Sequence, residues 1–291
     1  MVNFFRKNTI IILLLCCFTI VMTSCTGQKQ TIDINKDSLK IKIIDIGQGD
    51  AILIKHHKQN ILIDTGDVDQ QDNLVKILKN EQITNIDKLI ITHPHSDHLG
   101  GAIAVLDNFV VGTVYDNGQT TTTKLYRNYL KKIADKKINY TQLSAGMELN
   151  LGDNLLVKIL SPDKNFDKKG DLNGNSIVAK LIYKNFSMLF TGDIEDETEA
   201  ELFRNYGQDI KSSVLKSPHH GSRTSLNKEF LNIVGAKDVI ISVGKNNDYK
   251  HPHEETLKRY KALNMNVYRT DLNGTVTIDT NGDNYEIIKE R

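Results

Sequence analysis

The stretch Thr92-His93-Pro94-His95-Ser96-Asp97-His98-Leu99-Gly100-Gly101 gathers three histidines and one aspartate within six positions. It follows Lys88-Leu89-Ile90-Ile91, an apolar run typical of a strand. Imidazole and carboxylate groups are the ligands that divalent transition metals take in proteins. Alternate residues of an extended segment share a side, so His93 and His95 can address one ion while Asp97 and His98 face a second. The chain of 291 residues holds only nine histidines, so this clustering indicates a metal site rather than a polar loop.

The composition describes a globular chain. Hydrophobic residues make up 39% and charged residues 25%, as in proteins that bury a real core. The formal net charge of +1 gives no support for a surface that binds nucleic acid as a whole. A local basic patch stays open on the helix expected over 122–136, where it is either a solvated face or a DNA contact. Its members are Lys124, Arg127, Lys131, Lys132, Lys136 and Lys137.

The first 25 residues differ from the rest. A basic start is followed by an apolar run over 9–22, which is short for a membrane span of ~20 residues and fits an export signal. Small residues before Cys25 resemble a bacterial lipobox, with an uncleaved anchor as the alternative. All three cysteines lie in this region, so the remaining chain forms no internal disulfide. We therefore expect a lipoprotein signal peptide at 1–25 with lipidation at Cys25, a polar tether at 26–38 and a folded domain at 39–291. The domain would be exported and held at the outer face of the bacterial cytoplasmic membrane through the lipid anchor only.

The pattern of the body predicts its layers. Three closely spaced β-branched runs at 39–46, 51–54 and 60–66 predict an antiparallel meander. Helical periodicity then alternates with strands, and a second set of strands and helices follows from about residue 155. No linker rich in Pro, Gly or Ser interrupts 39–291. The sequence thus predicts a single α/β domain with two sheets back to back and helices outside, a four-layer αββα sandwich.

Several further motifs follow in order. They are Asp45-Ile46-Gly47-Gln48-Gly49-Asp50-Ala51, Leu215-Lys216-Ser217-Pro218-His219-His220-Gly221-Ser222, Asn246-Asn247-Asp248-Tyr249-Lys250-His251-Pro252-His253 and Tyr268-Arg269-Thr270-Asp271. Together with the stretch quoted first, they resemble the metallo-β-lactamase fold, and within it the hydrolase module of the ComEC/Rec2 competence family. The resemblance covers roughly 39–280. Those competence proteins also carry a multi-span channel, so the resemblance implies the hydrolase module alone, as a stand-alone lipoprotein.

Two divalent metal ions, Zn or Mn, are the expected cofactors. Asp193, at the tip of a strand, is placed to bridge the two ions, and one of two adjacent histidines completes the second site. Asp64 and Asp50 are expected to orient ligands from behind, although Asp64 could instead stabilise its own turn. The candidate ligands are His93, His95, Asp97, His98, Asp193, His219 and His220, with the choice between the last two left open.

One departure from the fold's usual pattern is informative. Many members supply a further mid-chain histidine to the first metal, yet no histidine lies between His98 and His219. Asn173-Gly174-Asn175-Ser176 stands there instead, as in the competence family. We expect the first metal to have fewer protein ligands and weaker binding, which leaves Mn²⁺ as plausible as Zn²⁺.

The resulting functional hypothesis is a phosphodiesterase or nuclease that acts on DNA outside the membrane through a two-metal-activated hydroxide. Asp97, Asp193 and His251 are its expected catalytic residues, and for the loop holding His251 a purely structural role is the alternative. His56 and His57 are expected on a solvated hairpin without a role. The expected substrate-binding residues are Asn175, Ser176, Ser222, Asn246, Tyr249, His251 and His253.

Two alternatives remain. One keeps the hydrolase and changes the substrate to a small or cell-wall phosphodiester of the phosphorylcholine type, a lactone or a β-lactam. The other is a lipid-anchored binding protein without enzymatic activity. The expected partners are a substrate phosphodiester, with DNA among the candidates, and the membrane through the lipid anchor only; the sequence leaves protein partners open.

Overall fold

The computed structural model describes residues 38–167, 170–225 and 227–291. The predicted signal peptide with Cys25, and the predicted tether except Ser38, lie outside the described residues. No helix within the described ranges is long and apolar enough to cross a membrane.

The first sheet contains eight strands among the described residues, in the order β15-β14-β1-β2-β3-β4-β5-β6. Strands β1, β2 and β3 pair antiparallel, so the predicted meander is confirmed. From β3 to β6 the pairing is parallel. The strand bounds are β1 Leu39–Ile43, β2 Ile52–His56, β3 Gln59–Ile63, β4 Asn85–Ile90, β5 Val110–Asp116, β6 Asn139–Gln142, β14 Val276–Thr280 and β15 Tyr285–Lys289.

The second sheet has seven strands in the described part of the chain, in the order β13-β12-β11-β10-β9-β8-β7. Strands β7 to β10 pair antiparallel, and β10 to β13 run parallel. The strand bounds are β7 Glu148–Asn150, β8 Leu155–Ser161, β9 Val178–Tyr183, β10 Phe186–Phe190, β11 Val214–Lys216, β12 Asp238–Ile241 and β13 Asn266–Arg269.

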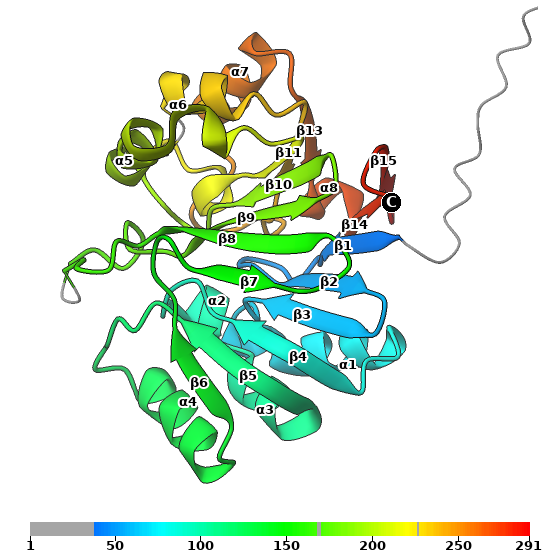
Figure 1. Ribbon diagram of the computed structural model, residues 1–291, viewed down its shortest axis with the longest axis vertical. Coiled ribbons are helices and arrows are strands. Elements are labelled where there is room, and N and C mark those ends of the chain that lie inside the picture. The colour runs from blue at the N-terminus through cyan, green and yellow to red at the C-terminus, as the bar shows by residue number, and fades with distance from the viewer. Residues whose placement is uncertain (1–37, 168–169, 226) are drawn as a thin grey trace, which may run out of the picture. The chain divides into compact units, whose positions relative to one another are not determined.

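Helices cover the outer faces of both sheets (Figure 1). Helices α1, α3 and α4 pack on the first sheet, and α5, α6 and α7 pack on the second. Their bounds are α1 Gln71–Asn80, α3 Ala102–Asn108, α4 Lys124–Asp135, α5 Asp196–Tyr206, α6 Lys228–Val234 and α7 Glu254–Ala262. The shorter helices are η1 Val68–Gln70, α2 Ser96–Leu99, η2 Gly207–Ile210, η3 Pro218–Gly221 and α8 Thr270–Asn273.

An apolar layer holds the two sheets together. Leu39, Ile41 and Ile43 of β1 alternate along the strand, so all three face the second sheet, where they join Met188 and Phe190 of β10. Burying one such side chain contributes roughly 1.5–3 kcal/mol. The predicted four-layer αββα sandwich is therefore confirmed.

Three of the six basic residues assigned to the face of α4 pair with carboxylates. Lys131 pairs with Asp135 at 2.6 Å, and Lys132 pairs with Asp107 of α3 at 3.0 Å. Lys136 lies 3.4 Å from the same Asp107 carboxylate. These contacts favour a solvated helix face over a DNA contact on this helix.

His56 departs from its prediction. The solvated hairpin expected for His56 is wrong, because β2 continues through this residue and its side chain is only 2% exposed. Ile52, Ile54 and His56 lie on the same face of β2, and the two isoleucines belong to the core between the sheets. His57, next in the chain, stays exposed in the turn.

Candidate metal centre

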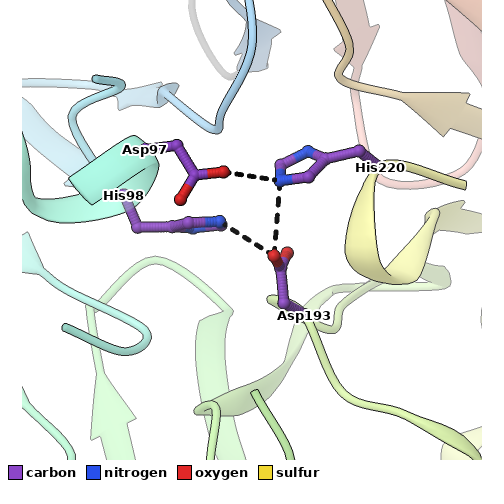
Figure 2. A group of neighbouring side chains, drawn as sticks. All are labelled: Asp97, His98, Asp193 and His220. Atoms are coloured by element: carbon purple, nitrogen blue, oxygen red, sulfur yellow. Dashed lines mark ion pairs between the residues drawn. The ribbon is translucent and has the colours of Figure 1, made fainter. Parts of the chain in front are cut away.

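Four side chains from both sheets converge on one point. Asp97 and His98 belong to α2, which follows β4, whereas Asp193 follows β10 and His220 follows β11. Each residue offers one ligand atom, and these four atoms lie within 4.8 Å of one another (Figure 2). Oδ2 of Asp193 is 3.2 Å from Nε2 of His98 and 3.3 Å from Nε2 of His220. Nε2 of His220 is also 3.3 Å from Oδ2 of Asp97.

The outer ring nitrogens of both histidines are held from behind. Nδ1 of His220 donates to the carbonyl oxygen of Ser242 at 2.9 Å. Because a carbonyl oxygen only accepts, neutral His220 keeps its proton on Nδ1 and offers the lone pair of Nε2 to the cluster. Nδ1 of His98 faces Oδ2 of Asp64 at 2.8 Å, which selects the same tautomer. A carboxylate behind a ligand histidine is the usual support of a metal site.

Asp64 is itself fixed. Its Oδ1 accepts from the backbone N–H of Thr92, and its Oδ2 accepts from the Thr92 hydroxyl, both at 2.7 Å. The residue is fully buried and has a φ of 57°, in the left-handed region that costs a non-glycine residue energy. Such strain at a buried carboxylate indicates a positioning task.

The donor set fits a divalent metal ion. Nε2 of His98, Nε2 of His220 and Oδ1 of Asp193 are buried, and no hydrogen bond from the described residues reaches them. Orphaned buried polar atoms are rare in native proteins. Two imidazoles and two carboxylates are a suitable ligand set for Zn²⁺ and, through the carboxylates, for Mn²⁺.

The charges of the cluster agree with this. Burial raises the pKa of Asp193, but His220 and His98 outweigh burial and hold that pKa well below its usual range. Burial lowers the pKa of His220, yet Asp193 and then Asp97 raise it to about 10. The carboxylates therefore stabilise positive charge at this point, which protons or metal ions can supply.

His93 and His95 lie at the edge of the cluster. Nε2 of His93 is 3.0 Å from Nδ1 of His95 and 4.0 Å from Oδ2 of Asp193. Within the described residues, the two histidines do not form a compact group of three ligand atoms with a carboxylate. The second-site ligand atoms thus gather around one point, whereas the first-site pair lies together but farther from the carboxylates.

The two adjacent histidines of η3 point differently. His219 and His220 both have left-handed φ values, 45° and 51°. Nδ1 of His219 lies 3.1 Å from Glu195, and its Nε2 is 4.0 Å from Asp193. The His219 side chain is 20% exposed against 2% for His220. Only His220 joins the compact cluster.

A cavity of about 260 Å³ opens over the cluster. Tyr249 and His251 line one side, with rings stacked at 5.7 Å and 23°. Burial, then His220 and His219, lowers the pKa of His251 to about 4, so this imidazole is neutral at pH 7. The other lining residues are Gln48, His95, Ser96, Asp97, Asn173, Asp193, His219 and His220.

The other predicted substrate residues do not line this cavity. Ser176 accepts from the backbone N–H of Asp193 at 3.2 Å, and the Asn175 side chain donates to the Asp167 carbonyl. Nδ1 of His253 accepts from a backbone N–H at 3.0 Å. Ser222 contacts the Thr224 hydroxyl, whereas Asn246 is exposed at a turn. These contacts shape loops, so a direct role in substrate binding stays a prediction.

Sequence reasoning missed Lys216. This fully buried lysine of β11 pairs with Oδ2 of Asp50 at 2.8 Å. Oδ1 of the same carboxylate is 3.6 Å from Nδ1 of His220. Lys216 therefore fixes the Asp50 carboxylate beside His220, a candidate metal ligand. Its place in the motif that contains His219 and His220 was the available signal.

Gly49 allows the turn after β1 to approach the backbone of Asp97 closely. Its φ is +117°, and a Cβ there would lie 2.1 Å from the backbone oxygen of Asp97. The next residue, Asp50, donates its N–H to the same oxygen at 3.1 Å. The turn after β1 thus sets the position of Asp97.

Comparisons with known proteins agree with this geometry. Residues 44–245 match the family described as the Metallo-beta-lactamase superfamily. ComE operon protein 3 of Bacillus subtilis (strain 168) is similar at 31% identity over 263 residues, covering 81% of this chain and 32% of that protein. Recombination protein 2 of Haemophilus influenzae is similar at 31% over 296 aligned positions, covering 100% of this chain and 34% of that protein.

The chain spans about a third of the length of these curated relatives. Among solved structures, Igni18, a metallo hydrolase from the archaeon Ignicoccus hospitalis, superposes with a TM-score of 0.55 at 17% identity. The match covers 82% of this chain and 98% of Igni18. At this identity the likeness shows the fold alone.

Proposed function

Because the chain belongs to the metallo-beta-lactamase superfamily of metal-dependent hydrolases, we propose that it hydrolyses phosphodiesters, with DNA outside the cytoplasmic membrane as its main substrate. The observation that carries the proposal is the convergence of Asp97, His98, Asp193 and His220 within 4.8 Å under an open cavity. Two carboxylates and two imidazoles suit hard and borderline dications, which suit phosphate oxygens in turn.

The proposed cofactors are two divalent ions, Zn or Mn. Asp97, His98 and His220 would hold one ion, His93 and His95 the other, and Asp193 would reach both. When bound, such a pair lowers the pKa of water and neutralises charge on the attacking and leaving oxygens. Among the described residues, His93 and His95 form no compact group with a carboxylate, which supports weaker binding at the first position.

The chain's own residues position the phosphodiester. Asp97 and Asp193 line the part of the cavity where a phosphate would approach the metal centre. His251, neutral at pH 7, faces the same cavity and can donate a hydrogen bond from its one ring N–H to a phosphate oxygen, which stabilises the charge that builds up there. Tyr249 is 64% exposed and stacks on His251, so a base can stack on its free face.

DNA is the proposed substrate because relatives bear the names ComE operon protein 3 and Recombination protein 2. The proposed location, lipid-anchored outside the membrane, rests on the sequence around Cys25. The same proposal includes a role for this protein in DNA uptake during competence.

A small phosphodiester is the second candidate, and one observation favours it. A cavity of about 560 Å³ adjoins the metal centre through Glu195 and is lined by carboxylates. The carboxylates are Asp163, Asp167, Asp171, Glu195, Asp196, Glu197 and Glu201. Like charges there repel a polyanion more strongly than a small phosphodiester with a single negative charge, so DNA would have to leave the centre on the Tyr249 side.

Hydrolysis of single-stranded DNA and of bis-p-nitrophenyl phosphate by the full chain, with Mn²⁺ or Zn²⁺, tests the proposal. We expect both to be cleaved and expect D193N to lose at least ~10²-fold in rate. Cleavage of only the small ester would assign the second candidate. Hydrolysis of nitrocefin alone would overturn the phosphodiester assignment, and no hydrolysis with either metal would point to a binding protein.

A further inference from the structure

A second group of metal-binding side chains lies where two hairpins from different sheets meet. His56 ends β2 and His57 begins the turn to β3, whereas Asp153 lies in the turn between β7 and β8. One ligand atom from each residue lies within 4.8 Å of the other two. Nε2 of His57 is 3.5 Å from Oδ2 of Asp153, and the two imidazole centroids are 4.2 Å apart.

His56 provides an independent observation that points to a ligand. Its side chain is only 2% exposed, and neither ring nitrogen makes a hydrogen bond of good geometry among the described residues. The backbone of Ser38 and that of Asp153 lie nearest and raise its pKa, although burial and then His57 lower it overall. The ring is fixed by packing against Tyr183 at a centroid distance of 4.9 Å. A buried imidazole without a well-formed hydrogen bond is costly, because it gives up its hydrogen bonds to water.

We propose that His56, His57 and Asp153, the hairpin site, bind a transition-metal dication of the Zn²⁺ class. Two imidazoles and one carboxylate are a common ligand set for such ions, and water can fill a fourth position. Ligand atoms around Zn²⁺ are about 3.3 Å apart at bond lengths of ~2.0–2.1 Å, so the group must contract slightly. The side chains that must move are the exposed ones, since Asp153 is 69% and His57 32% exposed.

The hairpin site lies at the end of the sheets remote from the metal centre. Strand β2 runs away from the Gly49–Asp50 turn, which contacts Asp97, and reaches His56 at its other end. Strand β8 pairs Ser161 with Val178 near the centre and Leu155 with Tyr183 at the far end. A bound ion there would fasten the first sheet to the second. The Gln59 amide already donates to the Leu151 carbonyl across the same junction at 2.7 Å.

Metal counting on the full chain tests the proposal, with no affinity tag present. The protein is equilibrated with Zn²⁺, free metal is removed, and zinc per chain is measured for the parent, H57N and D153N. Both changes affect exposed side chains, and asparagine tolerates the left-handed φ of 48° at position 153. We expect each variant to hold about one zinc less than the parent. D72N, which changes an exposed carboxylate on α1, is the matched control and should hold the same amount as the parent.

A second pair of variants separates this site from the metal centre. D193N should lose zinc from the centre yet keep the hairpin zinc, and Zn²⁺ should still raise its melting temperature. D193N/D153N should lose that gain. Phosphodiester hydrolysis by D153N should stay within about twofold of the parent, because the site is remote from the reaction. Equal zinc contents in the parent, H57N and D153N would overturn the proposal, whatever the enzyme's substrate proves to be.

Discussion

Oδ2 of Asp64 lies 2.8 Å from Nδ1 of His98, and neither side chain is exposed to solvent. The Asp64 carboxylate therefore sets the tautomer and direction of a ligand histidine without reaching the cluster itself. D64N keeps the shape but can donate instead of accept, so we expect metal affinity or activity to fall ~10–100-fold. Metal titration with a competing chelator measures the loss. D72N, a carboxylate change on the surface, should leave affinity unchanged, and an unaltered affinity in D64N would contradict this role.

The neighbours His219 and His220 should behave differently when changed. H220N removes a side chain from the compact cluster, so we expect loss of tightly bound metal and a fall in kcat/KM of at least ~10²-fold. H219N should keep its metal, because His219 faces Glu195 and the cavity wall. Metal content and kcat/KM, measured on both variants, check this pair. Metal loss in H219N with retention in H220N would reverse the assignment.

Metal binding should release protons at pH 7. Without metal, the pKa of His220 is about 10 and that of His98 is raised above its usual value, so both imidazoles carry a proton that the metal must displace. Affinity should then rise with pH from neutrality towards pH 10 and fall on acidification. Calorimetric titration in buffers of different ionisation enthalpy counts the protons released. A buffer-independent heat at pH 7 would contradict the expected protonation.

Gly49 should tolerate no side chain. In G49A the added Cβ would lie 2.1 Å from the Asp97 backbone oxygen, so the turn or Asp97 must move. G146A is the matched control, since Gly146 also has a positive φ, +87°, but its Cβ would have open space. The backbone strain common to both costs ~1–3 kcal/mol of unfolding free energy. We expect G49A alone to lose metal affinity and activity as well, as metal titration and urea unfolding would report.

Lys216 should matter for stability. K216M leaves the buried Asp50 carboxylate without its cation, which costs ~3–5 kcal/mol in comparable pairs. The double variant D50N/K216M removes both charges and should recover part of the loss. Urea unfolding of the two single variants and the double variant gives the coupling free energy. Strict additivity would mean that the 2.8 Å contact contributes nothing.

Sequence patterns predicted the layers because the core strands alternate clearly between apolar and polar residues. Leu39, Ile41 and Ile43 face one way, and the sheet order follows from short connections. The short strands β6 and β7 escaped prediction, because their exposed or half-buried residues carry little periodicity. Burial of His56 escaped as well, since it depends on contacts with residues distant in the sequence, such as Tyr183 of β9.

The site was predictable by motif but not in its finer geometry. His93-x-His95-x-Asp97-His98 marks the candidate ligands at one strand end, and the candidate role of Asp193 follows from its strand-end position. The choice between His219 and His220 depends on two left-handed residues in one turn, which no periodicity encodes. The pairing of Lys216 with Asp50 joins residues far apart in the sequence, so the motif around Lys216 could single out the lysine but not its partner.

Each sheet supplies two members of the compact cluster, Asp97 and His98 from the first, Asp193 and His220 from the second. Neither half can therefore assemble the site alone, and metal occupancy becomes a thermodynamic reporter of how the halves are docked. A change in the layer between the sheets, such as Met188→Ala, should weaken metal binding although no ligand is altered. Conversely, metal ions that bind only the docked sheets would stabilise the native state against unfolding. Metal binding at the centre and folding of the domain are therefore thermodynamically linked.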